Sequence, residues 1–425
     1  MPEVFVVPTL AVVGLGYVGL PIAVEAHRAG FSVRGYDTSQ AVVDGLRAGR
    51  SHVGDISDDD VAALLAAGFA PSTDETVLDG ADVVTVCVAT PLTVQGVPDL
   101  GDVRTAARTV GRHLSRGSLV VLESTTYPGT TDGVFAPIIA DVSGLKPGVD
   151  FHVAFSPERI DTGNPAYNLR NTPKVVGGLT EACSVVATEF YRRLCDEVVV
   201  ATSSREAEMS KLIENTYRFV NIALVNEFAT AASALGVDLW NAIGCAASKP
   251  FGFQAFYPGP GLGGHCIPSD PVYLAYQSRS VGRPLQLVEM ARTVNDGMPA
   301  HVVARARQIL HEAGRTTEGA SVLLAGVSYK RDSADVTITP AEPIARLLRA
   351  AGATVCYSDP QVPAWSVDGE PVAYEPDLGG AAGRADLTIL LQDHSGFDLD
   401  ALPSQARLLL DTRGRLRHAH VPTLW

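Results

Sequence analysis

The feature that most constrains the fold of this chain is a glycine-rich turn near its start. The apolar run Leu10 to Val13 leads directly into GLGYVG at 14–19, and a helical pattern follows. In such a strand, turn and helix, the first glycine permits a tight turn, the second admits a pyrophosphate, and the third lets helix and strand pack closely. An acid at the end of the next apolar run would accept hydrogen bonds from a ribose diol and repel a 2′-phosphate. The pattern predicts a doubly wound domain that binds NAD rather than NADP, with a flavodoxin-like turn as the alternative, through Gly14, Gly16, Tyr17, Val18, Gly19 and Asp37.

Short apolar runs that alternate with helical stretches extend the predicted parallel sheet. These runs lie at residues 81–90, 118–125 and 151–158. The crevice of a doubly wound sheet lies at the carboxyl ends of its strands, so the residues that end these runs are candidates for the ligand edge. They are Thr90, Ser124, Thr125 and Glu158. The hydroxyl groups could equally cap helices, whereas Glu158 follows a proline at a strand end and caps nothing obvious.

A long helix is predicted from residue 203 to about 235, where the sequence lacks glycine and proline and has apolar residues at spacings of three and four. It is more apolar around its circumference than a surface helix needs to be, so we expect a partner helix or a second subunit to cover it. This predicts a homodimer. Lys211 and Asn215 are four residues apart and share one face. They could hold an oxyanion or water, or simply be solvated.

The last third of the chain predicts a second open α/β domain. Its expected strands lie at 321–330, 354–360, 385–391 and 407–413, with a helix from about Ala341. This part lacks the glycine fingerprint. Lys330, at the end of its first strand, could meet a phosphate or remain solvated. The expected organisation is therefore two Rossmann-like doubly wound domains, residues 1–202 and 301–425, joined by a long central helix and a helical middle domain, residues 203–300.

The stretch PGPGLGGHCIPSDP at 258–271 is the strongest indication of covalent chemistry. Its glycines and prolines predict a loop of defined shape that holds Cys266 and leads to Asp270. An ionised thiol is a nucleophile, so a thiol on such a loop indicates a ligand site. The alternative is a glycine-proline linker that contains an unrelated cysteine.

Composition excludes several classes of partner. A net charge of −14 argues against a nucleic-acid or anionic-membrane surface, although a few amides and lysines can still bind an anionic ligand. The first residues lack a signal-peptide pattern, and no apolar run reaches the roughly 18 residues of a membrane helix. The six cysteines show no CxxC pair and no zinc spacing. We therefore expect reduced thiols, no structural metal and a cytoplasmic protein.

Six motifs together resemble the nucleotide-sugar 6-dehydrogenases of the UDP-glucose/GDP-mannose dehydrogenase family over nearly the whole chain. They are GLGYVGLP at 14–21, ESTTYPGTT at 123–131, SPER at 156–159, EMSKLIENTYRFVNIALVNE at 208–227, the Cys266 stretch at 258–271, and GVSYKRDSAD at 326–335. Within the family, the sequence at 249–268 is most similar to the UDP-N-acetylglucosamine 6-dehydrogenases. The resemblance implies oxidation of a UDP-sugar C6 alcohol to a carboxylate, with NAD as the oxidant.

The resemblance also implies roles for individual residues. The catalytic thiol falls on Cys266, the general base on Glu158, and the hydroxyl that orients water on Thr125, or on its neighbour Thr126. The supporting polar groups fall on Lys211, Asn215 and Asp270. Thr90 and Thr125 would border the cofactor. The residues expected to border the substrate are Glu158, Arg159, Lys211, Asn215, Phe256, Tyr257, Gly259, Gly263, Tyr329 and Lys330.

The sequence departs from the family pattern at two positions. Where the family usually carries an arginine, in a run like DxRxSP, this chain has Thr337, which leaves the nucleotide and the sugar open. Thr162 replaces an acid found in some UDP-glucose enzymes. UDP-glucose, UDP-N-acetylmannosamine and UDP-N-acetylgalactosamine remain alternative substrates. A two-electron 3-hydroxyacid dehydrogenase would not need Cys266, and the last alternative is a sugar-nucleotide binder without turnover.

Overall fold

The chain folds into two compact units. The computed structural model describes residues 7–93, 95–161, 164, 166–416, 419 and 422. The first unit comprises Met1–Glu214 and Val272–Arg283, and the second comprises Asn215–Pro271 and Pro284–Trp425. Two of the three boundaries, after Glu214 and after Pro271, fall inside helices, and the third, after Arg283, falls between two helices. Each unit is described by itself below.

An eight-stranded sheet forms the centre of the first unit, in the order β3-β2-β1-β4-β5-β6-β7-β8. The strands are β1 (Thr9–Val13), β2 (Ser32–Tyr36), β3 (Ala70–Ser72), β4 (Val83–Val86), β5 (Leu119–Leu122), β6 (His152–Phe155), β7 (Lys174–Gly178) and β8 (Val198–Val200). Neighbouring strands are parallel except β6 and β7. The strand order reverses between β1 and β4, which is where a doubly wound sheet opens its ligand crevice.

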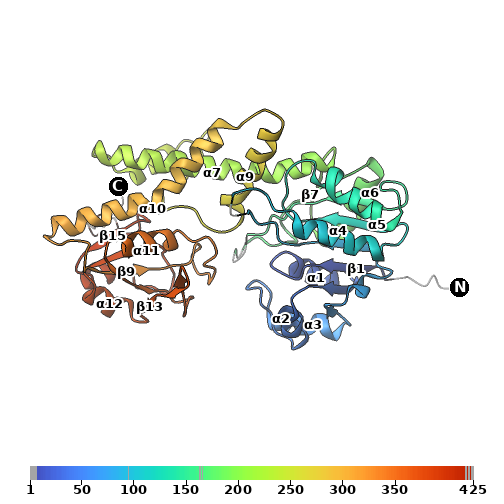
Figure 1. Cartoon of the computed structure of the whole chain (residues 1–425), viewed down its shortest axis with the longest axis horizontal. Coiled ribbons are helices and arrows are strands. Elements are labelled where there is room, and N and C mark those ends of the chain that lie inside the picture. The colour runs from blue at the N-terminus through green and yellow to red at the C-terminus, as the bar shows by residue number, and fades with distance from the viewer. Residues whose placement is uncertain are drawn as a thin grey trace. The chain divides into compact units, whose positions relative to one another are not determined.

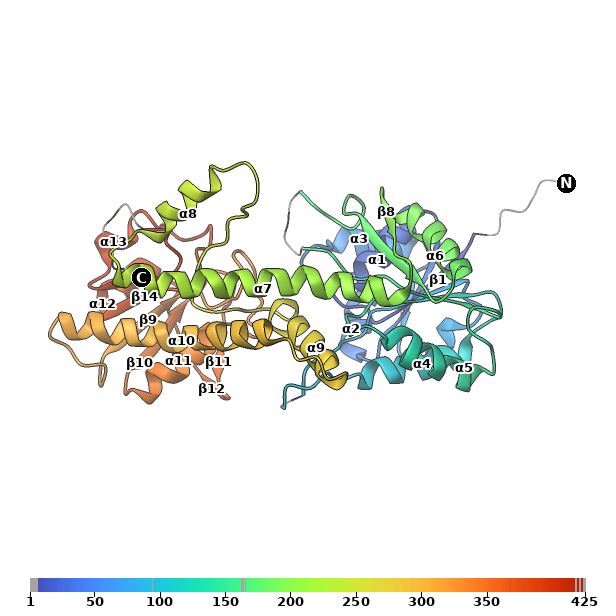
Figure 2. The same ribbon diagram turned by 90° about the horizontal axis from the view of Figure 1, so that it is seen from above.

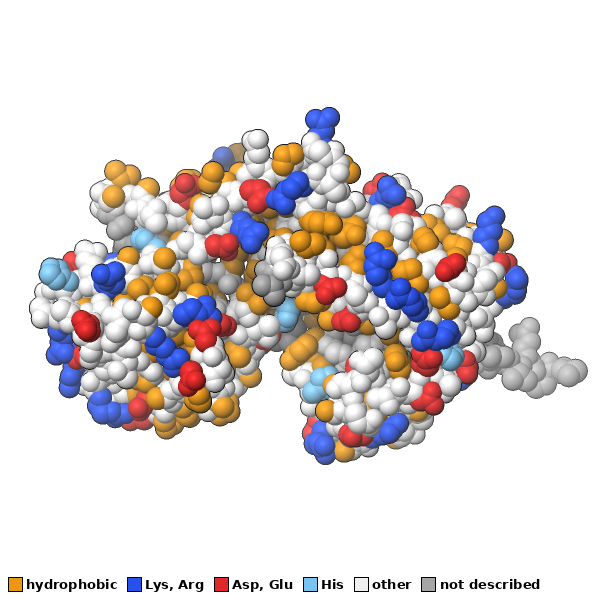
Figure 3. Space-filling model, viewed as in Figure 1, with side chains coloured by type: hydrophobic (Ala, Val, Ile, Leu, Met, Phe, Trp, Pro, Cys, Tyr) orange, Lys and Arg blue, Asp and Glu red, His pale blue; other side chains and the backbone are white. Residues whose placement is uncertain are grey.

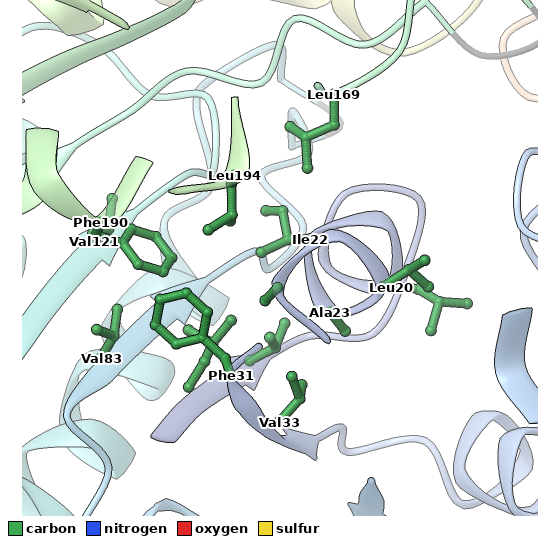
Figure 4. Close-up of a cluster of buried hydrophobic side chains, with 14 of the residues drawn as sticks. Leu20, Ile22, Ala23, Phe31, Val33, Val83, Val121, Leu169, Phe190 and Leu194 are labelled. Atoms are coloured by element: carbon green, nitrogen blue, oxygen red, sulfur yellow. The ribbon is translucent and has the colours of Figure 1, made fainter. Parts of the chain in front are cut away.

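Helices of the first unit cover this sheet (Figure 1). They are α1 (Gly19–Arg28), α2 (Gln40–Arg47), α3 (Asp58–Ala66), η1 (Glu75–Leu78), α4 (Gly101–His113), η2 (Thr131–Phe135), α5 (Ala136–Ser143) and α6 (Glu181–Leu194). Phe31 and Phe190 meet edge to face in the core, with their ring centroids 5.6 Å apart, beside Ile22 of α1 (Figure 4). This packing fixes α1, and therefore the turn that precedes it, against β1.

The middle of the chain is helical, as predicted. It contains α7 (Ser204–Ala234), α8 (Leu239–Ala247), α9 (Cys266–Ser280) and α10 (Gln286–Glu312). Figure 2 shows α7 as one continuous helix. No helix in the described parts of the chain is long and apolar enough to cross a membrane. Figure 3 shows basic side chains lying among acidic and hydrophobic ones on one face of the molecule.

The prediction that Cys266 and Asp270 lie on a loop was wrong. The irregular backbone ends at His265, and Cys266 is the first residue of α9, which also contains Asp270. Pro268 is compatible with this because it lies in the first helical turn, where the amide has no intrahelical partner. Pro271 lies beyond this first turn, in the helix interior. The sequence analysis took the prolines as evidence against a helix, whereas Pro268 is compatible with the start of α9.

A second parallel sheet forms the core of the second unit, in the order β13-β10-β9-β14-β15. Its strands are β9 (Ser321–Ala325), β10 (Thr354–Ser358), β13 (Ala373–Tyr374), β14 (Leu387–Leu390) and β15 (Leu409–Asp411), with a separate hairpin of β11 (Ser366–Val367) and β12 (Glu370–Pro371). The accompanying helices are α11 (Ala341–Ala350), α12 (Leu378–Arg384) and α13 (Leu402–Gln405). Two doubly wound α/β regions with a helical middle confirm the predicted fold class.

Candidate active site

The glycine turn after β1 leaves one open position. A Cβ on Gly14, whose φ is 88°, would lie 2.5 Å from the carbonyl oxygen of Cys87, and one on Gly19 would lie 1.9 Å from the carbonyl oxygen of Gly14. Both glycines are therefore required by the chain's own packing. A Cβ on Gly16 would meet nothing within 4 Å. The open space at Gly16 fits the close approach of a pyrophosphate.

The start of α1 provides the rest of this cradle. Val18 occupies the cap position, and its apolar side chain cannot hydrogen-bond the first amides of the helix. Those amides and the helix dipole therefore suit an anionic group. Tyr17 is 56% exposed beside them. The residues present fit a dinucleotide whose pyrophosphate lies at this helix end.

Asp37 follows β2 and braces the same turn. Its Oδ2 accepts a hydrogen bond from the Leu15 amide at 2.9 Å, and its Oδ1 accepts one from the Ser39 amide at 2.8 Å. The side chain remains half-buried rather than enclosed. Each carboxylate oxygen has more than one lone pair, so Asp37 can hold the turn and still accept hydrogen bonds from a ribose diol.

The second sheet repeats this bracing with a different outcome. Asp359 follows β10, and its two oxygens accept hydrogen bonds from the Val327 amide at 2.7 Å and the Gln361 amide at 2.9 Å. Unlike Asp37, it is 1% exposed, and its Oδ2 also lies 3.1 Å from Nε2 of the buried His394. Burial opposes ionisation of Asp359, but the hydrogen bonds from His394 and Val327 lower its pKa overall. Both oxygens of Asp359 are therefore used in hydrogen bonds within its own unit.

Glu158, after β6, is held in place by backbone groups. Its Oε1 accepts hydrogen bonds from the Arg159 amide at 2.7 Å and from the Ile160 amide. Its Oε2 is buried and has no hydrogen-bond partner among the described residues. Lys211 of α7 donates to the backbone carbonyl of Glu158 at 2.5 Å. The structure therefore brings the predicted site residues Glu158 and Lys211 together.

Arg159 is directed away from Glu158. Its guanidinium donates to the carbonyl of Pro173 at 2.6 Å and forms an ion pair with Glu214 at 2.8 Å. The two hydroxyl candidates also differ. Thr126 is fully buried and its Oγ1 has no hydrogen-bond partner in the described parts of the chain, while Thr125 is half-buried. Thr125 is therefore the more accessible of the pair. Thr162 lies outside the described residues.

The loop that carries Thr125 is anchored to α7 by Glu208. This fully buried carboxylate accepts hydrogen bonds from the Gly129 amide at 2.6 Å, the Thr131 amide at 2.8 Å and the Thr131 hydroxyl at 2.7 Å. Thr90 is fixed separately, because its carbonyl accepts a hydrogen bond from the Tyr273 hydroxyl at 2.6 Å. Two of the predicted cofactor-edge residues thus lie on segments that are tied to helices.

Glu208 should make stability depend on pH. Burial raises its pKa to about 7 from 4.5, although its hydrogen bonds with Thr131 and Gly129 oppose the shift. The folded chain then binds a proton that the unfolded chain releases. This contribution is complete below pH 4.5 and is lost as the pH rises to about 7. Compared with Glu208→Gln, the wild type should lose about 3 kcal/mol of unfolding free energy across this window. Urea unfolding of both proteins at several pH values measures the difference, and parallel curves would contradict it.

In the second unit, Asn215 and Asp270 form a buried pair. The Asn215 amide nitrogen donates to Oδ2 of Asp270 at 2.5 Å, and the two residues are 6% and 3% exposed. Asp270 lies one turn after Cys266 in α9, and Cys266 is exposed. The structure thus unites two predicted site residues and places the thiol at the exposed start of the same helix.

The glycine loop before Cys266 packs tightly against the segment after β9. A Cβ on Gly263 would lie 2.4 Å from Cβ of Tyr329, and the Gly264 amide donates to the carbonyl of Ile338 at 3.2 Å. Ile338 has a φ of 49°, a conformation that a β-branched residue rarely adopts. At the other end of the loop, the Gly259 amide donates to the buried side chain of Asn226 at 3.0 Å. The loop is therefore fixed at both ends.

The aromatic and lysine candidates are less enclosed. Phe256 packs edge to face on Tyr217, with their ring centroids 5.7 Å apart. It also borders the apolar cluster around Trp240, which supports a structural role. Tyr257 is 54% exposed, and Lys330 is half-buried.

An arginine cluster that the sequence analysis missed lies beside the glycine loop. A Cβ on Gly259 would lie 3.3 Å from the guanidinium of Arg413. Three guanidinium groups face the carboxylate of Asp393: Arg413 at 3.8 Å, Arg415 at 3.1 Å and Arg331 at 3.9 Å. Three positive charges around one negative charge favour an anionic ligand. The only sequence signal was the position of Arg413 at the end of a predicted strand.

Comparisons with known proteins agree with this architecture. Residues 8–195, 205–297 and 323–418 match the NAD binding domain, central domain and UDP binding domain of the UDP-glucose/GDP-mannose dehydrogenase family. The chain is thus an NAD-dependent oxidoreductase of the class that acts on nucleotide sugars. It belongs to the UDP-glucose/GDP-mannose dehydrogenase family, as the motifs indicated.

Individual relatives carry different sugar names. The chain is 35% identical to the UDP-N-acetyl-D-mannosamine dehydrogenase of Pyrococcus horikoshii over 390 residues, which is 91% of this chain and 90% of that protein. It is also 35% identical to the UDP-N-acetyl-D-glucosamine 6-dehydrogenase of Pseudomonas aeruginosa over 389 residues, or 91% of each chain. The solved structure of the UDP-D-ManNAc dehydrogenase from Pyrococcus horikoshii has a TM-score of 0.87 at 32% identity, covering 95% of each chain. Sequence identity to these relatives therefore does not distinguish between the sugars named for them.

Proposed function

We propose that this enzyme oxidises the C6 alcohol of a UDP-hexose, preferably UDP-N-acetylglucosamine, to the carboxylate. The observation that supports this most directly is the exposed Cys266 at the start of α9, one turn before the buried Asn215–Asp270 pair. A thiol allows oxidation to continue beyond the aldehyde, because it can hold the aldehyde covalently. No disulfide joins the six cysteines, all of which lie among the described residues, and this suits a reducing compartment such as the cytoplasm.

The overall reaction converts one C6 alcohol, one water and two NAD⁺ into one carboxylate, two NADH and three protons. When bound at Gly16 and Asp37, NAD supplies the hydride acceptor in both oxidations. The Cys266 thiolate adds to C6 of the aldehyde and gives a thiohemiacetal, and oxidation of this adduct gives a thioester. Water then attacks the thioester carbon, and the C–S bond breaks to release the carboxylate and the thiol.

The other site residues would handle charge and protons in this scheme. Lys211 and Asn215 would hold the oxygen at C6 as it becomes negative, at about 3 kcal/mol for one well-placed donor. Glu158 would accept protons through Oε2, and Thr125 would orient the water. Asp270 would fix the amide of Asn215, to which it is already hydrogen-bonded.

The nucleotide part of the substrate is assigned to the last domain. We propose residues 1–202 as the NAD domain, 203–300 as the helical domain with the thiol, and 301–425 as the nucleotide-sugar domain. Arg413 and its neighbouring arginines would bind the diphosphate, with Gly259, Gly263, Tyr329 and Lys330 at the border. This cluster would supply positive charge to a chain that has Thr337 where the family usually carries an arginine.

The test of the proposed function is the NADH yield with limiting sugar nucleotide. UDP-N-acetylglucosamine, UDP-N-acetylmannosamine, UDP-N-acetylgalactosamine and UDP-glucose would be compared in parallel by absorbance. About two NADH per sugar, with the highest kcat/KM for UDP-N-acetylglucosamine, is expected. One NADH per sugar would contradict the thioester route. A yield of two with another sugar would correct the substrate, and no turnover with any of them would favour a non-catalytic binder.

We also propose a homodimer formed through the helix at 203–235. Within the second unit, α7 exposes Tyr217, Leu224 and Phe228 at spacings of seven and four, which is one helical face. Exposed apolar side chains of this size on one face favour burial by a second subunit.

Phe228→Glu should convert the dimer to a monomer, because it would bury a charge in the new interface. Sedimentation velocity at micromolar concentration measures the mass. Val185→Glu on α6 is the matched control, since both side chains are 52% exposed. A wild-type mass of one chain, or a dimer that survives Phe228→Glu, would count against this interface.

A further inference from the structure

A buried ionic cluster lies directly behind Glu158 in the first unit. Lys174 begins β7, and Glu123 follows the carboxyl end of β5. Their side chains are 2% and 0% exposed, and the Lys174 ammonium lies 2.6 Å from Oε2 of Glu123. Tyr191 of α6, also fully buried, donates its hydroxyl hydrogen to the other Glu123 oxygen. Both oxygens of Glu123 are therefore occupied.

The same ammonium faces Glu158. It lies 3.7 Å from Oε2, the carboxylate oxygen that has no hydrogen-bond partner among the described residues. The other oxygen of Glu158 is occupied by backbone amides. Lys174 therefore lies between two carboxylates, bonded to one and within reach of the other. Burying three ionisable side chains is costly unless their charges compensate each other.

The surrounding groups leave Lys174 as the cation that acts on Oε2. Burial raises the pKa of the Cys87 thiol at the end of β4, and it raises the pKa of Cys195 after α6 to about 11, so both thiols are neutral. Lys211 donates to the backbone carbonyl of Glu158. Arg159 is paired with Glu214.

The lysine itself remains charged in this environment. Burial alone would lower the pKa of Lys174, but the carboxylates of Glu123 and Glu158 raise it above its usual value. Burial raises the pKa of Glu123, while the ammonium of Lys174 and the hydrogen bond from Tyr191 oppose that shift. Removing a charge from this cluster would change the electrostatic potential at the neighbouring Oε2 of Glu158.

We propose that Lys174 is a positioning residue that, held by Glu123 and Tyr191, orients Oε2 of Glu158 for proton transfer. This inference rests on the proposed role of Glu158 as the base. None of these three supporting residues needs to contact the substrate. The arrangement makes the strength of the base depend on residues from three other elements of the sheet and its helices.

The two partners should shift the pH profile in opposite directions. In Lys174→Met the attraction to Oε2 is lost, so the acid limb of kcat/KM should move to higher pH by about one unit or more. In Glu123→Gln the Lys174 ammonium no longer faces a second carboxylate and acts on Glu158 alone. The acid limb of the kcat/KM profile should therefore move to lower pH. Lys146→Met removes an exposed lysine of the same unit as a control and should leave the profile unchanged.

The experiment measures kcat/KM from pH 5.5 to 9.5 with the preferred UDP-sugar for wild type, Lys174→Met, Glu123→Gln, Lys146→Met and Glu158→Gln. Thermal unfolding and NAD binding at pH 8 check that each variant is folded. Glu123→Gln keeps the test decisive where Lys174→Met is unstable. Acid limbs that stay in place in both cluster variants, or move in the same direction, overturn the inference.

Glu158→Gln separates this inference from the proposed function. If that variant keeps the wild-type rate and profile, Glu158 is not the base and the proposed function requires another residue. If it loses about a hundredfold or more in kcat/KM while the cluster variants keep the wild-type profile, only the role of Lys174 is wrong.

Discussion

Cys266→Ala is expected to reduce carboxylate formation by at least about a thousandfold while leaving NAD affinity unchanged. The thiol is the only group in the proposed scheme that can carry the substrate from the aldehyde to the acid level, so its loss removes a covalent step rather than a contact. Carboxylate is measured by chromatography of the product, and NADH by absorbance with limiting sugar nucleotide. NAD binding is measured by calorimetry, because the dinucleotide turn is formed by a different part of the chain.

Cys245→Ala is the matched control for this substitution. Cys245 lies on α8, is exposed like Cys266, and belongs to the same unit. It should retain wild-type rates, which would exclude a general effect of removing an exposed thiol. Carboxylate production by Cys266→Ala at a rate close to wild type would rule out the thioester scheme and require direct oxidation of an aldehyde hydrate.

The second large effect is expected at the dinucleotide turn, where alanine at Gly16 should weaken NAD binding and alanine at Gly19 should lower stability. Gly16→Ala adds a methyl group to open space, so the fold should be retained, but NAD binding should weaken about tenfold or more because the methyl group occupies the approach to the pyrophosphate. Gly19→Ala would place Cβ 1.9 Å from the carbonyl oxygen of Gly14. Backbone must move to relieve that overlap, and we expect about 3 kcal/mol of lost stability.

Calorimetric titration with NAD and urea unfolding without NAD distinguish these outcomes. Gly16→Ala should change affinity and leave the free energy of unfolding within about 1 kcal/mol of wild type. Gly54→Ala, which also adds a methyl group to open space at a glycine without a positive φ, controls for the loss of a glycine elsewhere in the unit. Tight NAD binding by Gly16→Ala would mean that the cofactor does not approach the chain at this turn.

The fold was predictable because its signals are local. Strand ends, glycine turns and the helical period were all visible within windows of about 20 residues, and the observed β1, β4, β9 and α7 lie where the sequence placed them. The start of α9 was not predictable in this way. A proline is compatible with a first helical turn but disfavoured in later turns, and the sequence of 258–271 does not show where that first turn begins.

The site was predictable only where a motif carried it. Glu158, Lys211, Asn215 and Asp270 lie in recognisable stretches, and the structure pairs Lys211 with Glu158 and Asn215 with Asp270. The arginine cluster at Asp393 and the lysine behind Glu158 lie in no such pattern. Lys174 and Glu123 are 51 residues apart in sequence, and only the sheet brings them together. From the sequence alone, Lys174 is only a lysine at the start of a short apolar run.

The contrast between the two bracing carboxylates has a consequence for how the enzyme responds to its cofactor. The turn braced by Asp359 is completed internally by His394, whereas the turn braced by Asp37 ends in open space at Gly16. A ligand stabilises only the states that bind it. Bound NAD should therefore stabilise the first unit directly, so that the resistance of this part of the chain to proteases rises with the supply of the enzyme's own oxidant.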